Sequence, residues 1–384
     1  MEKARHIRLS KSCIGTLERS AVDEVLQSEF LGMGEVVKSF EDDLSEYFGR
    51  SSLCVANGTA ALQLALQACG IGPGDEVLVP SLTYLASFQA ISAIGALPIA
   101  CDVDESSLCI DPVDAESLIT NKTRAVMPVH YGGGVGNLDK IYDLAKRHGI
   151  RVVEDAAHAF GSNYQDRRVG SFGDIVCFSF DGIKNITSGE GGCIVTADKK
   201  IIQFVSDARL LGVERDTEAR YKGGRSWDFD VCAQGWRYHM SNIMAAIGKM
   251  QLKQFPAAAA KRCALAQRYT KKFSTIDTIK PILTNFEAIV PHIYVLRIDK
   301  LNDRDGLRKK LRQLGIETGV HYLPNHYLSY YKDSSVKGLP ITERIYPDLL
   351  TLPLHPDLST EDIDYVVETL VQLLPEHVAK IAGC

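Results

Sequence analysis

Several patterns that would indicate a metalloprotein, a redox protein or a common hydrolase are missing from the sequence. The ten cysteines include no Cys-x-x-Cys pair, and most lie in apolar runs such as Asp174-Ile-Val-Cys-Phe-Ser-Phe180. We therefore expect free, buried thiols in a reducing compartment and no metal site. Neither His-Glu-x-x-His nor Gly-x-Ser-x-Gly occurs, so the zinc-protease and α/β-hydrolase motifs are absent.

The sequence also lacks a large excess of either positive or negative charge. Lys and Arg number 43 against 48 Asp and Glu, so the bulk charge does not favour a nucleic-acid partner. The longest uncharged stretch, residues 77–101, contains Pro80, Gly95 and Pro98, which indicates strand, turn and helix inside a core and no membrane span. The first residues lack the apolar core of a signal peptide. We therefore expect a cytoplasmic protein without membrane association.

A dinucleotide-binding fingerprint is also absent. Gly132-Gly-Gly-Val-Gly-Asn137 follows an expected strand, but Asn137 breaks the Gly-x-Gly-x-x-Gly spacing. The run also lies too far along the chain for a typical first βα turn, and no Walker lysine motif occurs. The sequence thus argues against a nicotinamide-dependent nucleotide-sugar oxidoreductase.

Short apolar runs alternate with helical patterns in the first part of the chain. The expected strands are residues 76–79, 97–102, 125–129, 150–154, 174–180 and 192–196. The expected helices are residues 17–30, 36–48, 60–68, 84–94 and 137–148. This alternation predicts an α/β fold with a doubly wound, mostly parallel sheet.

The pattern changes to an α+β style near Pro256. The expected elements there are a basic helix at 257–273, a strand at 288–298, a helix at 305–314, a strand end at 319–322 and a closing helix at 361–374. Ser359 or Thr360 can cap the last helix. We therefore predict a large domain over residues 1–254 and a smaller one over 255–384.

Two local patterns in the first part of the chain could hold a ligand, and each also has an ordinary structural explanation. Asn57-Gly58-Thr59-Ala60 opens a helix of small residues, where free amides suit a phosphate, although a simple N-cap explains it too. Asp155 leaves an apolar strand at the edge where α/β sheets bind ligands, but it could only cap a helix. His158 follows it and could simply be packed.

Two further patterns lie close together. An apolar strand delivers Ser179 and then Lys184. A lysine at the mouth of a sheet either extends to water or has a lowered pKa, as an imine-forming nucleophile requires. The glycine-dense turn Ser188-Gly-Glu-Gly-Gly192 could bring backbone close to a flat ligand, or could be only a loop.

The order of these motifs resembles the PLP-dependent sugar aminotransferases of the DegT/DnrJ/StrS type. These enzymes are a branch of the fold type I aspartate aminotransferase superfamily. The resemblance covers nearly the whole chain. It rests on Phe30-Leu-Gly-Met-Gly34, Asn57-Gly-Thr-Ala-Ala-Leu62, Gly74-Asp-Glu-Val-Leu-Val-Pro80, Pro128-Val-His-Tyr-Gly132, Val153-Glu-Asp-Ala-Ala-His158, Lys184-Asn-Ile-Thr-Ser-Gly-Glu-Gly-Gly192, Met240-Ser-Asn242, Gly319-Val-His-Tyr322 and Leu352-Pro-Leu354.

The resemblance implies a large PLP-binding domain with a seven-stranded type of sheet, a smaller α+β domain, and a homodimer with shared active sites. It implies that Lys184 is the Schiff-base lysine and that Asp155 pairs with the pyridine nitrogen. Tyr84 would stack on the ring, and His158 would lie near its phenolic oxygen. The groups implied for the phosphate are the amides of Gly58, Thr59 and Ala60 and the hydroxyl of Ser179.

One segment departs from the family pattern. Relatives often read Gly-x-Asn-Tyr-Arg-Met-Ser-Asn, where the first Asn reaches the PLP phosphate of the partner subunit. This chain has Arg237 in place of that Asn and His239 in place of the Arg. An arginine can still bind a phosphate, so the resemblance implies that Arg237 serves the partner's cofactor.

The resemblance also bears on the substrate. It places Glu190, His321 and Tyr322 near it, and Gly189-Glu-Gly-Gly192 resembles relatives that aminate C4 of a ketosugar. The implied reaction passes an amino group from L-glutamate to a nucleotide-linked ketosugar, an NDP-4-keto-6-deoxyhexose, for a polysaccharide or a secondary metabolite.

Three alternatives stay open at the level of sequence. The enzyme could aminate C3 of an NDP-3-ketosugar, or it could act on a free ketosugar or aminocyclitol. A regulatory PLP-binding protein without turnover is the third, and the presence of both Lys184 and Asp155 argues against it.

Overall fold

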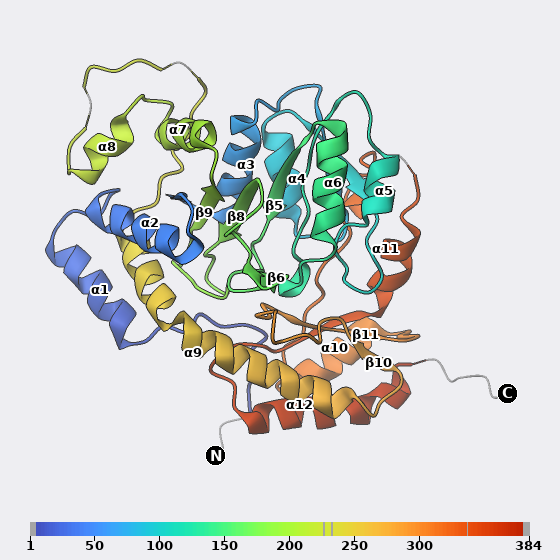
Figure 1. The fold of residues 1–384 in the computed structure, drawn as a ribbon. Coiled ribbons are helices and arrows are strands. Elements are labelled where there is room, and N and C mark those ends of the chain that lie inside the picture. The colour runs from blue at the N-terminus through green and yellow to red at the C-terminus, as the bar shows by residue number, and fades with distance from the viewer. Residues whose placement is uncertain (1–4, 226, 232, 336, 379–384) are drawn as a thin grey trace.

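A seven-stranded sheet forms the centre of the larger part of the molecule (Figure 1). The computed structural model describes residues 5–225, 227–231, 233–335 and 337–378. The sheet has the order β1-β9-β8-β5-β4-β2-β3. Its strands are β1 (Ser52–Val55), β2 (Glu76–Pro80), β3 (Leu97–Cys101), β4 (Thr123–Val126), β5 (Arg151–Asp155), β8 (Ile175–Ser179) and β9 (Gly192–Thr196). The pairs from β3 through β8 are parallel and β9 is antiparallel to both neighbours, which confirms the predicted α/β fold.

Helices cover both faces of this sheet because its strands carry apolar side chains on both sides. Val77 and Val153 belong to one core cluster, which includes α3 (Gly58–Ala68), α4 (Leu85–Ala93) and α7 (Lys199–Ala208). The alternate residues Leu78 and Val152 pack on the opposite side with α5 (Pro112–Ser117) and α6 (Leu138–His148). Toward β8 and β9, α2 (Glu35–Phe48) completes that second layer.

A three-stranded antiparallel sheet organises the smaller part of the molecule. It consists of β10 (Ile279–Pro281), β11 (Tyr294–Ile298) and β12 (Leu349–Leu352), in that order. Helices α10 (Arg304–Gln313) and α12 (Thr360–Leu373) pack against it in one hydrophobic cluster. The hydroxyl of Ser359 accepts the Asp362 N–H, so the predicted cap of the closing helix is confirmed.

The remaining elements are short or peripheral. They are α1 (Thr16–Gln27), α8 (Asp216–Tyr221), α11 (Pro340–Ile345), the small hairpin β6 (Asn163–Tyr164) and β7 (Arg167–Arg168), and the 3-10 turns η1 (Tyr131–Gly133), η2 (Asn325–Tyr327), η3 (Tyr346–Asp348) and η4 (Leu374–Glu376).

One long helix joins the two parts and corrects a prediction. The helix expected at 257–273 is only the second half of α9 (Asn242–Phe273), which continues through Pro256. A proline inside a helix removes one hydrogen bond. The helix persists because its first half packs on the large core through Ala245, while its second half packs on the small core through Tyr269. The division at 254/255 lies inside α9 and stays a prediction.

A second correction concerns the strand expected at 288–298. Only Tyr294–Ile298 is strand. The preceding residues bond to the large part instead, because the Val290 N–H donates to Ser162 Oγ at 3.1 Å and the His292 N–H donates to the Gly132 carbonyl at 2.9 Å. This contact brings His292 toward the large sheet. The sequence prediction also missed β1 and β12.

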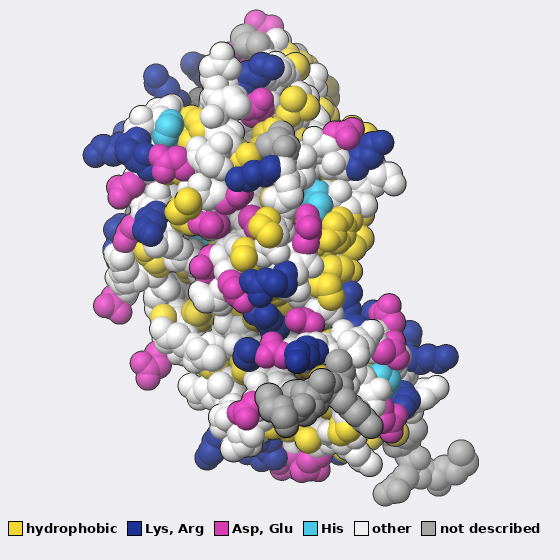
Figure 2. Space-filling model, turned by 90° about the vertical axis from the view of Figure 1, so that its right-hand side faces the viewer, with side chains coloured by type: hydrophobic (Ala, Val, Ile, Leu, Met, Phe, Trp, Pro, Cys, Tyr) yellow, Lys and Arg dark blue, Asp and Glu magenta, His cyan; other side chains and the backbone are white. Residues whose placement is uncertain are grey.

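The described cysteines are free, as expected, and five of them are buried. Cys232 and Cys384 lie outside the described residues. Within those residues no group of His, Cys, Asp or Glu could hold a metal ion, and none of the described helices is long and apolar enough to cross a membrane. Figure 2 shows Lys and Arg side chains interspersed with Asp and Glu, so that face carries no broad field of one sign.

Candidate functional site

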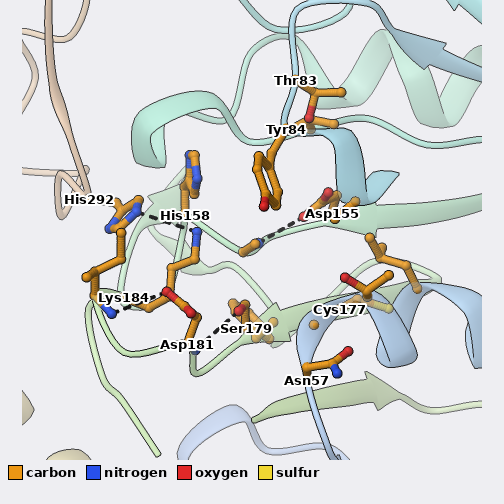
Figure 3. A pocket seen from close by; sticks show the side chains of 18 of the residues that line it. Asn57, Thr83, Tyr84, Asp155, His158, Cys177, Ser179, Asp181, Lys184 and His292 are labelled. Carbon is orange, nitrogen blue, oxygen red and sulfur yellow. Dashed lines mark hydrogen bonds between the residues drawn. The ribbon is translucent and has the colours of Figure 1, made fainter. Parts of the chain in front are cut away.

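A cavity of about 430 Å³ opens at the carboxyl ends of β5 and β8 and contains most of the predicted site residues (Figure 3). Ligands bind at this edge in open α/β sheets, because the strand ends and the loops after them leave a crevice there. The lining includes Gly58, Thr59, Tyr84, Asp155, His158, Ser179, Lys184, Glu190, His321 and Tyr322. Only Ala60 and Arg237 among the predicted residues do not line it.

Asp155 is the last residue of β5, and its side chain is held from two directions. The Ser87 hydroxyl of α4 donates to Asp155 Oδ2 at 2.7 Å, and the Ala157 N–H donates to Oδ1 at 3.2 Å. Asp155 is only 6% exposed. These two donors hold the carboxylate at the cavity wall.

Lys184 extends into the same cavity from the loop that follows β8. Its Nζ lies 3.5 Å from His292 Nε2. Burial lowers the pKa of Lys184 to about 8, against the opposing charges of Asp155 and Asp181. Of the two alternatives that the sequence left open, the structure therefore favours the lowered pKa, which makes the amine a better nucleophile near neutral pH.

The backbone selects the tautomer of His158. The Gly132 N–H donates to His158 Nδ1 at 3.2 Å, so the ring proton lies on Nε2. That Nε2–H donates to the Tyr322 hydroxyl at 2.9 Å. Burial lowers the pKa of His158 well below its usual value, with Lys184 adding to the effect. His158 is thus a neutral imidazole in a defined orientation.

The start of α3 forms one end of the cavity. The first amides of a helix have no acceptor within the helix, and those of Gly58 and Thr59 lie at the lining. Gly58 is required there, because a Cβ would come within 2.8 Å of Ser179 Cβ. The Ala60 N–H donates instead to Asn57 Oδ1 at 2.8 Å. The predicted contact of Ala60 with a phosphate stays a prediction.

Tyr84, which the resemblance places on the cofactor ring, lines the cavity together with the predicted substrate residues Glu190, His321 and Tyr322. Tyr84 is 61% exposed, and its ring centroid lies 5.6 Å from that of Tyr322. His321 Nδ1 is 2.8 Å from Thr351 Oγ1 on β12. Burial and the neighbouring charge of Asp181 raise the pKa of Glu190. The structure brings these residues to one cavity, and their contacts with a substrate stay predictions.

Arg237 lies elsewhere in the chain. Its backbone pairs with Leu210, and its side chain lines a separate hollow beside Trp227 and Phe229. A single chain therefore does not bring Arg237 to its own cavity. The expectation that it serves a partner subunit stays a prediction. His239 pairs with Val55 through the backbone, and burial lowers its pKa to about 4.

Sequence reasoning missed Asp181 and His292, which line the cavity, and Ser87, which bonds Asp155 from behind the lining. Ser87 lies in the first turn of α4, and its hydroxyl is 3.0 Å from that of Thr83 just before the helix; this local spacing does not indicate the contact with Asp155. Asp181 follows the strand end beside Ser179, so its position could have been suspected. His292 follows Pro291 with no motif around it.

The donor set fits pyridoxal phosphate. A helix N-terminus and the Ser179 hydroxyl suit its phosphate, and the Lys184 amine suits its carbonyl carbon. The Asp155 carboxylate can pair with a protonated ring nitrogen. Figure 3 places Asp155 across the cavity from the Lys184–His292 contact, with Tyr84 beside the space between them.

Comparisons with known proteins agree with this fit. The model of the DegT/DnrJ/EryC1/StrS aminotransferase family matches residues 12–371. The chain belongs to this family. It is 36% identical over 380 residues to the spore coat polysaccharide biosynthesis protein SpsC of Bacillus subtilis strain 168, covering 96% of this chain and 98% of SpsC.

Solved structures of relatives share the fold of this aminotransferase. TlmJ from Streptoalloteichus hindustanus is 32% identical with a TM-score of 0.89, over 96% of this chain and 99% of TlmJ. The sugar aminotransferase Spr1654 from Streptococcus pneumoniae in its PLP form is 30% identical with a TM-score of 0.90, over 97% of this chain and 100% of that chain. A PMP form of the same relative is also known. The chain is thus a PLP-dependent sugar aminotransferase.

Proposed function

We propose that this aminotransferase moves an amino group from L-glutamate to C4 of a nucleotide-linked 4-keto-6-deoxyhexose. The observation that carries the catalytic part is the convergence of Lys184, Asp155 and the start of α3 on one cavity. The similarity to SpsC, a spore coat polysaccharide biosynthesis protein, supports a product used in a polysaccharide. A cytoplasmic location is consistent with the free thiols.

Two residues carry the proton chemistry in this proposal. Pyridoxal phosphate, when bound, supplies a carbonyl that condenses with amines and a ring that withdraws electrons from the reacting carbon. Lys184 binds the cofactor covalently, and its released Nζ accepts and returns the proton of the reacting carbon. Its lowered pKa of about 8 leaves a useful fraction of neutral amine near neutral pH. Asp155, held by Ser87, keeps a proton on the ring nitrogen.

The other residues bind and orient. The Gly58 and Thr59 amides and the Ser179 hydroxyl hold the phosphate, because helix N-termini attract anions. Tyr84 covers one ring face. The Nε2–H of His158 is already bound to Tyr322, so this pair would form a fixed wall beside the bound cofactor. Such fixed contacts leave the reacting groups little freedom to misalign.

The proposed C4 preference rests on Glu190 in the Gly189-Glu-Gly-Gly192 turn. Its carboxylate lies at the cavity mouth, where it can accept hydrogen bonds from sugar hydroxyls. His321 and Tyr322 line the same cavity and would contact the same sugar. The two alternatives, amination at C3 of an NDP-3-ketosugar and amination of a free ketosugar, would use the same lining residues.

A homodimer with shared active sites completes the proposal. Trp227 is 85% exposed and Phe229 is 54% exposed, and both lie beside Arg237. Exposed aromatic side chains gathered around one hollow are typical of an interface. A second copy of the chain would cover them and receive Arg237 at its cofactor phosphate.

Mass spectrometry of products tests the substrate assignment. The enzyme with pyridoxal phosphate is offered L-glutamate and, separately, NDP-4-ketosugars, NDP-3-ketosugars and free ketosugars. The expected result is an amino sugar only from the 4-keto compounds, with release of 2-oxoglutarate. An amino product only from a 3-keto or a free sugar would overturn the C4 assignment and leave the family assignment intact.

A further inference from the structure

We propose that His292 is the positioning residue that holds the Lys184 amine whenever that amine is not bound to the cofactor. The inference deepens the proposed function, since it concerns the same lysine. Figure 3 shows the contact as a dashed line from the Lys184 amine to the imidazole of His292. Among the described residues, His292 is the side chain whose polar atom Lys184 Nζ reaches, at 3.5 Å.

The imidazole of His292 is held rigidly from both sides of its backbone. Its N–H donates to the Gly132 carbonyl at 2.9 Å, and its carbonyl accepts the Arg262 guanidinium of α9 at 3.2 Å. The residue is 3% exposed, and its ring centroid lies 4.5 Å from that of His158. In this setting the Nε2 edge of the ring lies 3.5 Å from Lys184 Nζ.

The charges around His292 keep it neutral. Burial lowers its pKa well below the usual value, and the positive charges of Lys184 and Arg262 act in the same direction, as do the neighbouring rings of His158 and His321. A neutral imidazole has one nitrogen lone pair in the ring plane. In the tautomer that carries its proton on Nδ1, which has no partner among the described residues, His292 Nε2 accepts a hydrogen bond from the Lys184 ammonium.

A neutral acceptor differs from a carboxylate in its effect on the lysine. Asp155 and Asp181 face Lys184 and raise its pKa by charge, yet within the described part of the chain neither forms an ion pair with it. A carboxylate in hydrogen-bond contact would stabilise the ammonium strongly and keep the amine protonated. A neutral imidazole at the same place also orients the amine, but it stabilises the ammonium form of Lys184 less than a carboxylate would.

The contact also joins the two parts of the molecule. Lys184 follows β8 of the large sheet, whereas His292 lies two residues before β11 of the small sheet. Arg262, itself 2% exposed, bonds the carbonyls of both His292 and Leu354. The released lysine is therefore oriented by the small part of the chain, which can couple the position of that part to the reactivity of the amine.

The test measures the ionisation of Lys184 in the full chain freed of pyridoxal phosphate. Trace acetylation with acetic anhydride is followed against pH, and the Lys184 peptide is quantified by mass spectrometry. For the wild type, the midpoint of the rise in Lys184 acetylation with pH should lie near pH 8. His292→Leu removes the acceptor, so the ammonium loses a hydrogen bond and the midpoint should fall by about one pH unit. An unchanged or raised midpoint overturns the proposal.

Paired variants keep the test independent of folding defects. His292→Gln places an amide oxygen near the position of Nε2 and should keep the wild-type midpoint, whereas the shorter His292→Asn should behave like His292→Leu. Thermal melting confirms that each variant is folded. His321→Leu removes a neighbouring imidazole that does not bond Lys184 and should leave the midpoint near that of the wild type. Equal shifts in the Gln, Asn and His321→Leu variants overturn the role of His292.

Borohydride reduction of the same variants loaded with pyridoxal phosphate separates this inference from the proposed function. Cofactor fixed to Lys184 together with an unchanged acetylation midpoint refutes only the role of His292. Cofactor fixed to another lysine refutes the proposed role of Lys184, whatever its midpoint.

Discussion

The hydroxyl of Ser87 on α4 donates a hydrogen bond of 2.7 Å to Asp155 Oδ2 at the end of β5. The bond ties a helix on one face of the sheet to the carboxylate at its ligand-binding edge. It fixes the orientation of the Asp155 side chain, because the hydroxyl donates to one of its two carboxylate oxygens. The acid proposed to hold the ring proton is thus positioned by a second element of the fold.

Removing that donor is expected to weaken the enzyme without unfolding it. Ser87→Ala should lower kcat about tenfold, since a hydrogen bond to a charged group is worth about 1.5–3 kcal/mol and part of it is replaced by water. Steady-state kinetics with L-glutamate measures the effect. Ser92→Ala on the same helix, which removes a bond to the Tyr331 hydroxyl away from the cavity, is the matched control. Equal losses in both variants would contradict a specific role for Ser87.

The charge of Asp155 should matter more than its shape. Asp155→Asn keeps the size and the contact with Ser87 but removes the negative charge that retains a proton on the ring nitrogen. We expect the variant to bind pyridoxal phosphate and to transaminate at least a hundredfold more slowly, because the lost ionic hydrogen bond is worth a few kcal/mol. Cofactor absorbance and single-turnover kinetics measure the two properties. A rate near that of the wild type would assign the ring proton to another group.

Lys184 should be the site of covalent attachment. Borohydride treatment of the yellow protein followed by peptide mapping should find the cofactor on Lys184 and on no other lysine. Lys184→Ala should retain weak cofactor binding, since the proposed phosphate contacts are on α3 and Ser179. Its turnover should fall by several orders of magnitude, as expected when a covalent catalyst is removed.

Arg237 supplies a test of the shared site. If it reaches the partner's cofactor phosphate, Arg237→Ala should bind pyridoxal phosphate about ten- to a hundredfold more weakly, since a charge-assisted pair is worth about 1.5–3 kcal/mol. Mixed dimers of Arg237→Ala and Lys184→Ala should regain one intact site. Activity measured after subunit exchange checks this. Unchanged affinity, or no recovery after exchange is verified, would place Arg237 outside the site and make His239 the next candidate.

A buried ion pair outside the cavity lining should control stability. Arg209 is fully buried, and its guanidinium donates to Glu41, to the Cys54 carbonyl and to the Tyr221 hydroxyl. Arg209→Met leaves Glu41 buried without its cation and should lower the free energy of unfolding by about 3–5 kcal/mol. Denaturant unfolding measures this. The exposed pair of Lys280 and Asp299 is the control, and Lys280→Met should cost less than about 1 kcal/mol.

Local chemistry let the sequence predict the framework and part of the site. The alternation of apolar strands with helices determined the mostly parallel sheet, because each strand buries both faces. Asp155 ends β5 and Lys184 lies in the loop that follows β8, so their approach to the ligand-binding edge follows from the sheet. Gly58 opens a helix, and its N-terminal amides need no distant partner to be free.

The tertiary structure alone decided the contacts that orient these residues. Ser87 and Asp155 are 68 positions apart, Lys184 and His292 are 108 apart, and His158 and Tyr322 are 164 apart. No local period or cap encodes such pairs, because each depends on how two separately formed elements pack. The same holds for α9, which passes through Pro256 since packing on two cores outweighs one lost hydrogen bond. The sequence thus determined which groups could react, and the packing of distant segments determined which neighbours hold them.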